Sequence, residues 1–504
     1  MFIITAGSVL KMIQNALGHP TWRKGLNYFL TARNFTYTTP QHLHESLQQA
    51  ANEDIPNNTP NVGEIMEGWE SQPGFPFITV SRNGTELTIE QNRFMYADRN
   101  SSTLWWIPIN YVVGSNPNYF DTRPDFWLRQ ERSRTINGID FGKPFTDQDW
   151  IIVNIQQSAY YRVNYEDAIW ELLIEVLNRP GDDYNQIHVM NRAQLIDDSH
   201  HLARAGILPY DHLLRIMTYM NKEIDYVPWA SANRANTLLN RWLAGTTVDR
   251  IFQNLMRRNI WSLFSRLGVR YIDDEPRVDR YARVIAINIA CQTGMPECLD
   301  PATEQLANFV YNGISIEPDL VDTIHCNGIR TASTHLFLTL QFRMLESPFQ
   351  AERNTIISGL GCTHRQDLLN SYLYMPFLAI DLSFTQAERS RILLSPLNQG
   401  PASIQTMINF VSENADVVNE ANLLATACAN IANRIHTQVL FNDFDSLLDR
   451  LGDRSLLSVA QIASYRVSAR TILDWQDLHL EASFSVLLQS NAQAGDYANE
   501  PMHV

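Results

Sequence analysis

Two histidines in the sequence HLHES, at positions 42–46, are the first residues whose spacing suggests metal chemistry. Zinc-dependent peptide hydrolysis of the HExxH kind needs two histidines four positions apart on one helical face, with a glutamate between them as general base. His44 and Glu45 are followed by Gln48, where the second histidine would have to stand. The leucines of this segment mark its apolar face, so we expect His42 and His44 to lie on the solvated side.

Other candidate motifs are also weak. His200 and His201 are adjacent, and neighbours on a helix point about 100° apart, so the pair cannot chelate one ion well and a structural role is expected. The sequence GLGC at 359–362 begins like a nucleotide loop, but His364 stands where the third glycine belongs. The acids Asp197-Asp198 are of a kind common on helix surfaces. We therefore predict no catalytic residue and no metal ligand in this chain.

Cysteines and glycosylation sequons are the remaining candidate sites. The cysteines show no CxxC spacing, and spacing alone suggests buried free thiols; they are Cys291, Cys298, Cys326, Cys362 and Cys428. Asn-x-Ser/Thr sequons often arise by chance, and the four here fit a glycoprotein only if the chain is secreted; they lie at Asn34, Asn57, Asn83 and Asn100.

Composition and charge limit the classes of function. At about 150 residues per domain, 504 residues suggest about three domains. A hydrophobic fraction of 45% is ample for sizeable cores. The net charge of −15 argues against nucleic-acid binding, which needs a basic face. No apolar run approaches the roughly 20 residues needed to span a bilayer, and the apolar start of the chain is interpreted as a core helix and not as a leader.

The elements fall into three predicted regions. Residues 1–72 are predicted to form short helices, of which the second presents an apolar face made by Trp22, Leu26, Phe29 and Leu30. Residues 73–165 are predicted to form a small β-domain, because two alternating runs flank an Asn-Gly turn at 83–84 and further runs are rich in β-branched and aromatic residues. Residues 166–504 are predicted to form paired helices of an irregular α-solenoid, with a globular helical bundle as the alternative.

Six ordered motifs across the chain resemble the zinc aminopeptidases of the aminopeptidase N type. They are GSVLKM at 7–12, WESQPGFPFITV at 69–80, LWWIPI at 104–109, WIIVNIQQSAYYRVNYED at 150–167, NRAQLIDDSHHLARAG at 191–206 and EIDYVPW at 223–229. The resemblance is to an animal gut or cell-surface member, with a C-terminal domain of the endoplasmic-reticulum aminopeptidase kind.

The resemblance implies a mainly α fold in three parts. They are a C-terminal remnant of a thermolysin-like zinc domain (1–72), a β-sandwich (73–165) and a HEAT/armadillo-like helical bowl (166–504). The family's HExxH and GxMEN motifs are absent from these residues, so zinc is expected in the full-length family and not in this chain. The family's catalytic tyrosine would fall on Ile3, which offers no donor to an oxyanion. The start of the chain is therefore interpreted as a truncation just after the catalytic half.

The resemblance also gives the cysteines a meaning. Surface members of the family carry a short and a longer disulfide at spacings like Cys291–Cys298 and Cys326–Cys362, which leaves Cys428 as a buried free thiol. Such bonds imply an oxidising compartment, and the family implies an extracellular or plasma-membrane location.

Three hypotheses of function follow. The first is the inactive C-terminal part of a peptidase that binds peptides together with its missing catalytic half or a homodimer partner. The second is a pseudo-peptidase or surface receptor whose bowl binds peptides or a protein. The third is a helical-repeat scaffold unrelated to peptides.

Overall fold

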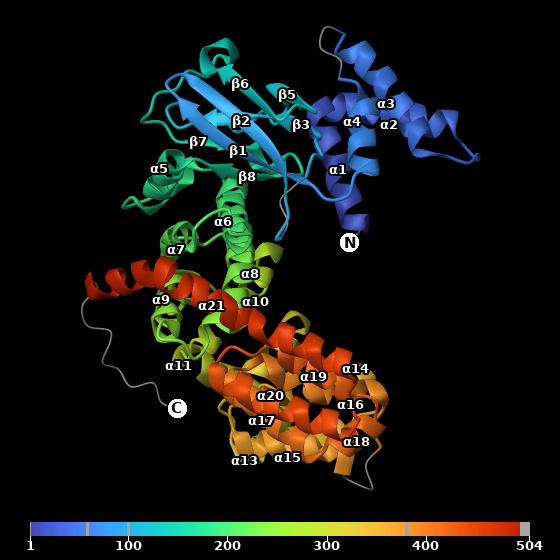
Figure 1. The fold of residues 1–504 in the computed structure, drawn as a ribbon, viewed down its shortest axis with the longest axis vertical. Coiled ribbons are helices and arrows are strands. Elements are labelled where there is room, and N and C mark those ends of the chain that lie inside the picture. The colour runs from blue at the N-terminus through green and yellow to red at the C-terminus, as the bar shows by residue number, and fades with distance from the viewer. Residues whose placement is uncertain (1, 57–59, 98–100, 379–382, 494–504) are drawn as a thin grey trace. The chain divides into compact units, whose positions relative to one another are not determined.

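The computed structural model describes residues 2–56, 60–97, 101–378 and 383–493, and the chain in it divides into two compact units. The units are Met1–Tyr219 and Met220–Val504 (Figure 1). The fold is mainly α, with small sheets confined to the first unit, as the sequence predicts for the described residues. The predicted boundaries at 72/73 and 165/166 both fall within the first unit, so the three-domain division stays a prediction.

Four helices open the first unit: α1 (Phe2–Leu17), α2 (His19–Ala32), α3 (Pro40–Asp54) and α4 (Val62–Ser71). Proline near the start of α2 and α3 suits positions where the backbone N–H has no helical partner. The predicted apolar face of α2 is only partly covered, since Trp22, Leu26 and Phe29 are partly buried. Only Thr21 and Gly25 are buried there, and Leu30 is 66% exposed. Gly25 faces α3 because a Cβ at this position would lie 2.8 Å from a methyl carbon of Leu47, so contact with α3 selects the small residue.

Within the described residues, eight strands form three small sheets. They are β1 (Pro76–Asn83), β2 (Glu86–Arg93), β3 (Trp106–Ile109), β4 (Tyr111–Val113), β5 (Phe126–Arg129), β6 (Ser133–Asn137), β7 (Ile151–Val153) and β8 (Arg162–Tyr165). The largest sheet has the order β6-β2-β1-β8, with β8 parallel to β1, and the other two pair β3 with β5 and β4 with β7. The predicted β1–β2 hairpin is confirmed: Asn83 pairs with Glu86 across a turn in which Gly84 has a φ of 57°.

Two adjacent tryptophans at the start of β3 have different surroundings. Trp105 is fully buried, and its ring lies 6.0 Å from that of Trp69. Trp106 is only partly buried. Its ring lies under the guanidinium of Arg129 at 5.6 Å. Successive strand residues point to opposite faces of a sheet, so the two neighbouring rings meet different surroundings.

We therefore expect Trp106→Ala to lower the free energy of unfolding by about 1–2 kcal/mol, because the ring is only partly buried and an exposed cation–π contact is weak. Trp105→Ala should cost clearly more, since it empties a fully buried site. Urea denaturation of both variants tests this. Equal losses would contradict the burial difference between the two rings.

The first unit ends with helices α5 (Asp167–Asn178), α6 (Val189–Arg204) and α7 (Tyr210–Met217). Helix α6 joins the strands through Arg162 of β8, which donates to Asp197 at 2.8 Å and to Asp198 at 2.9 Å. Asp198 also accepts from the backbone N–H of Val163 at 2.9 Å. The sequence suggests that Asp197 and Asp198 are ordinary surface charges. In the structure they link α6 to the sheet.

The second unit is built from fourteen described helices. They are α8 (Tyr226–Leu243), α9 (Asp249–Leu267), α10 (Arg277–Gln292), α11 (Pro296–Asn312), α12 (Val321–Ile329), α13 (Thr334–Glu346), α14 (Gln350–Leu360), α15 (Gln366–Leu378), α16 (Gln386–Leu394), α17 (Pro401–Glu413), α18 (Ala415–Glu420), α19 (Leu424–Ala432), α20 (Gln438–Asp453) and α21 (Val459–Gln493).

Neighbours in the second unit follow a repeating pattern. The even-numbered helices from α8 to α16 pack one against the next. Of the odd-numbered helices, α13 contacts α14 and α15 contacts α16. Helix α21 returns to contact α8 and α9 (Figure 1). Gln476 of α21 donates to the backbone oxygens of Trp242 at 2.6 Å and His436 at 3.0 Å. Because these partners lie far apart in sequence, α21 connects the two ends of the helical array.

Candidate functional site

The predicted position of His44 on a solvated helix face is wrong. His44 is buried, and its Nε2 lies 3.1 Å from Oε1 of Glu70 on α4. Gln48, one turn later, accepts from the backbone N–H of Val62 at 2.8 Å. Both residues therefore join α3 to α4, because a buried imidazole or amide needs a polar partner.

The histidine pair on α6 makes contacts that hold the fold together. The ring centroids of His200 and His201 are 4.8 Å apart in a T-shaped arrangement, and His201 Nδ1 lies 2.6 Å from the hydroxyl of Tyr96. Burial, and then the charge of Arg162, lower the pKa of His201 to about 3. A neutral imidazole hydrogen-bonded to Tyr96 positions α6 against the segment that follows β2. It leaves no pair of nitrogens directed at one ion.

The described residues do not fit a catalytic zinc ion. Such a site needs three protein ligands and an open position, and no group of three or more His, Cys, Asp or Glu side chains that could hold a metal occurs in the described ranges. Ile3 lies in the first turn of α1.

The cysteines pair as the resemblance implies. Cys291 is bonded to Cys298 between α10 and α11, and Cys326 of α12 is bonded to Cys362, which follows α14. Cys428 is a buried free thiol whose pKa burial raises to about 12. Among the sequons, Asn34 and Asn83 are exposed, whereas Asn57 and Asn100 lie outside the described residues. Glycosylation at all four stays a prediction.

The structure adds a feature that no motif predicts, a polar groove of about 820 Å³ in the second unit. It crosses α10, α12, α14 and α16 and includes both sulfur-bearing residues of the longer disulfide. Eight of its lining side chains are neutral amides or hydroxyls: Asn288, Thr323, Asn354, Thr355, Ser358, Ser390, Ser395 and Gln399. Its two charged residues are Asp322 and Arg391. Neutral donors and acceptors of this kind suit hydrogen bonding to a peptide backbone.

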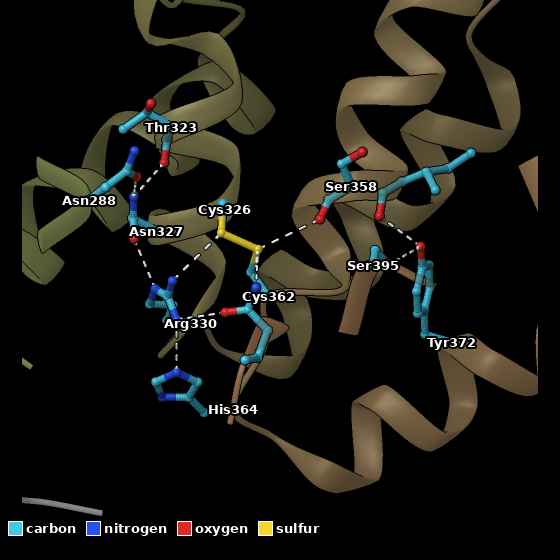
Figure 2. The surroundings of a disulfide bond; sticks show 12 residues. Asn288, Thr323, Cys326, Asn327, Arg330, Ser358, Cys362, His364, Tyr372 and Ser395 are labelled. Atoms are coloured by element: carbon cyan, nitrogen blue, oxygen red, sulfur yellow. Dashed lines mark hydrogen bonds between the residues drawn. A yellow bond between two sulfur atoms is a disulfide. The ribbon is translucent and has the colours of Figure 1, made fainter. Parts of the chain in front are cut away.

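Close helix contacts shape this groove. A Cβ on Gly359 would lie 2.8 Å from the Cβ of His325, and one on Gly361 would lie 2.1 Å from Oγ of Ser395. The sequence GLGC therefore brings α14 against α12 and the end of α16, and the likeness to a nucleotide loop is incidental. Tyr372 donates to the backbone oxygen of Ile357 at 2.7 Å and holds α15 against the same turn (Figure 2).

Arg330, just past the end of α12, lies beside the longer disulfide. Its guanidinium donates to Asn327 Oδ1 at 2.9 Å, to Gln399 Oε1 at 2.9 Å and to His364 Nε2 at 3.2 Å. It also lies 3.8 Å from Sγ of Cys326, and Figure 2 shows it between the disulfide and His364. Burial, and then the charge of Arg330, lower the pKa of His364 to about 4, so the imidazole stays neutral and accepts.

Comparison with known proteins identifies the family. Residues 150–462 match the model of the ERAP1-like C-terminal domain, so the chain belongs to that family. Aminopeptidase N of Plutella xylostella is 31% identical over 466 residues, which are 91% of this chain and 48% of that protein. Aminopeptidase N of Bos taurus is 30% identical over 73% of this chain and 38% of its own length. The resemblance to the C-terminal portion of the aminopeptidase N type is thereby confirmed.

Two further findings bear on the whole protein. A membrane alanyl aminopeptidase of Heliothis virescens is 26% identical over 92% of this chain and 46% of its own length. The chain thus spans about half the length of these insect relatives. Within the described residues, no helix is long and apolar enough to cross a membrane.

Proposed function

We propose that this chain is the C-terminal portion of a zinc exopeptidase that removes N-terminal residues from peptides. Its own task in this proposal is to hold the peptide, and the reaction takes place on an N-terminal catalytic half. The alignment carries the proposal: 91% of the chain matches 48% of an aminopeptidase N. HExxH and GxMEN do not occur among its 504 residues.

The polar groove supports the peptide-holding role. A peptide in extended form exposes backbone N–H and C=O groups that must find partners when they leave water. The amides and hydroxyls of α10, α12, α14 and α16 provide such partners without demanding one particular side chain. We further propose an extracellular or plasma-membrane location, since two disulfides favour an oxidising compartment. The proposed partners are peptides with the catalytic half or a homodimer partner.

The purified chain should release no amino acid from aminoacyl-amide substrates and should hold no stoichiometric zinc after dialysis. Addition of the separately expressed N-terminal half of the Plutella xylostella aminopeptidase N should restore bestatin-sensitive turnover, because the reaction then regains its metal centre. Elemental analysis and a fluorogenic assay measure both quantities. One tightly held zinc ion per chain, with inhibitable turnover by the chain alone, would contradict the proposal.

The alternative is a non-catalytic pseudo-peptidase or surface receptor whose groove binds peptides or a protein partner. The absence of a metal-holding group among the described residues fits this function as well. The same experiment separates the two. Peptide binding that persists while the added catalytic half never produces turnover would favour the alternative.

A further inference from the structure

The two disulfides of the second unit differ in their access to solvent. Cys291 and Cys298 are 1% and 0% exposed, so the shorter bond lies inside the core. Cys326 is only partly buried, and both cysteines of the longer bond line the polar groove. A thiolate breaks a disulfide by direct attack on one sulfur, so access decides which bond can react. The longer bond is therefore the accessible one.

A buried cation lies beside the longer bond. Arg330 is 4% exposed, its Nη2 lies 3.8 Å from Sγ of Cys326, and Figure 2 shows its guanidinium between the disulfide and His364. Its described hydrogen-bond acceptors are neutral side chains, those of Asn327, Gln399 and His364. Burial lowers the pKa of the guanidinium to about 10, so it is still a cation at neutral pH. Because a buried charge with neutral partners is costly, an anion formed next to it is stabilised.

Each sulfur of the longer bond is connected to that charge. Sγ of Cys326 faces the guanidinium directly. Sγ of Cys362 accepts from Nε2 of Gln399 at 3.3 Å, and Oε1 of the same amide accepts from Arg330 at 2.9 Å. Reduction of the bond produces thiolates, and a neighbouring cation or donor favours the thiolate over the thiol. Both sulfurs of the longer bond are therefore good leaving groups.

The shorter bond has the opposite surroundings. Sγ of Cys298 lies 3.3 Å from the backbone oxygen of Ile287, whose partial negative charge would repel a thiolate. Burial also raises the pKa of a thiol, as it does for the free thiol of Cys428, whose pKa is about 12. The chain thus holds one disulfide that favours thiolates and one that does not.

Other charges near Cys326 do not cancel the effect of the buried guanidinium. Asp322 lies one helical turn earlier on α12, and the C-terminus of this helix carries about half a negative charge. The carboxylate of Asp322 is exposed, however, and water and salt screen it far more than a buried charge. His325 and His364 are neutral at pH 7, because burial lowers the pKa of both. Arg391, the other cation of the groove, adds to the positive side.

We propose that the Cys326–Cys362 bond is a thiol–disulfide exchange site, which a dithiol reduces while the shorter bond stays oxidised. The bond joins α12 to the turn that follows α14, and both helices line the groove. Reduction therefore removes a covalent link from the wall of the groove. The proposed role of the chain in holding peptides is not needed for this reaction.

The exchange takes place in two steps. A thiolate of the dithiol attacks the accessible Sγ of Cys326, the S–S bond breaks, and Cys362 leaves as a thiolate that accepts from Gln399. The second thiolate of the dithiol then attacks its own sulfur in the mixed disulfide, which releases Cys326 as a thiolate beside Arg330. Two electrons pass from the dithiol, which becomes a cyclic disulfide, to the two cysteine sulfurs. The two protons that the dithiol loses go to solvent or to the new thiolates.

An equilibrium measurement tests the selectivity. The full chain is incubated at neutral pH in buffers with defined ratios of reduced to oxidised dithiothreitol, quenched with acid and alkylated. Peptide mass spectrometry then gives the reduced fraction of each cysteine pair. The longer bond should be half reduced at a ratio about tenfold or more below that of the shorter bond. Equal ratios, or earlier reduction of the shorter bond, would overturn the proposal.

A second measurement separates charge from exposure. In Cys362→Ser the free thiol of Cys326 stays beside Arg330, and the pH dependence of its alkylation by iodoacetamide gives its pKa. We expect this pKa to lie clearly below about 8.5, the ordinary value for cysteine. Cys298 in Cys291→Ser is the control and should have a pKa above that value. A Cys326 pKa at or above the ordinary value would overturn the proposal.

Variants of the arginine assign the effect. Arg330→Met should raise the dithiothreitol ratio that half reduces the longer bond, whereas Arg330→Lys, which keeps the charge, should raise it less. Arg450→Met is the control, because Arg450 is an exposed arginine that donates to the hydroxyl of Ser412 at 2.8 Å, and it should change nothing. An unchanged ratio in Arg330→Met would contradict the proposal. If this variant does not fold, the pKa of Cys326 beside the unmodified Arg330 decides.

Discussion

Replacement of both Cys326 and Cys362 by serine should lower the free energy of unfolding of the second unit by about 3.8 kcal/mol. The bond closes a loop with a sequence separation of 36 residues, and in the chain-entropy model the stabilisation grows with the logarithm of loop length. The bond also joins α12 to the end of α14 at the wall of the groove. Denaturant titration under non-oxidising conditions measures the loss.

Two controls accompany this prediction. The serine pair at Cys291 and Cys298, which are separated by 7 residues, should cost less, about 2.5 kcal/mol. Reduction of the unmodified chain should lower its stability toward that of the variants. Unchanged denaturation midpoints in the Cys326 and Cys362 variant would show that the bond does not constrain the unfolded chain.

Secondary-structure elements were predictable where residues close together in the sequence determine them. The β1–β2 hairpin follows from alternating residues around Asn83-Gly84, and a positive φ at Gly84 is what such a turn requires. Strands β5 and β6 were missed because four or five residues are too few to establish a period of two. The run LWWIPINYVV, one of those rich in β-branched and aromatic residues, is divided into β3 and β4 at Asn110, whose side-chain oxygen accepts from the backbone N–H of Ile155 at 2.8 Å.

Burial was less predictable than helix position. His44 was assigned to the solvated face because its immediate neighbours are leucines, yet Glu70 lies 26 residues later and provides the partner that lets the imidazole be buried. Leu30 of α2 shows the opposite error, because it was expected on an apolar face and is exposed. An apolar period in the sequence does not say whether another element covers that helix face.

The groove could not be predicted from motifs, because its residues come from four helices and are neutral and common in type. The one available signal was the pair of glycines at 359 and 361 beside Cys362, which indicates close backbone approach. Arg330 gave no signal at all, since a lone arginine in sequence is usually exposed. Its burial beside neutral partners is evident only in the three-dimensional structure.

Glu388→Gln should lower the free energy of unfolding of the second unit by about 3–5 kcal/mol, the range for breaking a buried ion pair from one side. Glu388 is 2% exposed and accepts from Nε of Arg353 at 2.7 Å. Arg353 in turn donates to the backbone oxygen of Met344 at 3.0 Å, near the end of α13. The pair thus joins α13, α14 and α16, two of which line the groove.

The charge of Glu388, and not its shape, should be responsible for that loss. Its other oxygen accepts from the backbone N–H of Thr385 at 2.9 Å, which completes the capping box at the start of α16. Glutamine keeps an acceptor for this cap and has the same length. The substitution therefore removes the charge that faces the Arg353 cation, at the oxygen that also accepts from Gln350 at 3.2 Å. Glu420→Gln, at the exposed end of α18, is the control and should have little effect.

The pH dependence of the unfolding free energy tests whether the charge of Glu388 stabilises the second unit. Burial raises the pKa of Glu388, but the hydrogen bonds from Arg353, Thr385 and Gln350 lower it more, from 4.5 to about 2. Because the folded-state pKa lies below the unfolded one, the stabilisation is fully present above pH 4.5 and is lost as the pH falls toward 2. A shift of this size corresponds to about 3 kcal/mol. The difference in stability between the unmodified chain and Glu388→Gln, measured by urea denaturation, should therefore shrink as the pH falls from 5 to about 2. A difference that stays constant over this range would mean that the carboxylate contributes by packing and not by its charge.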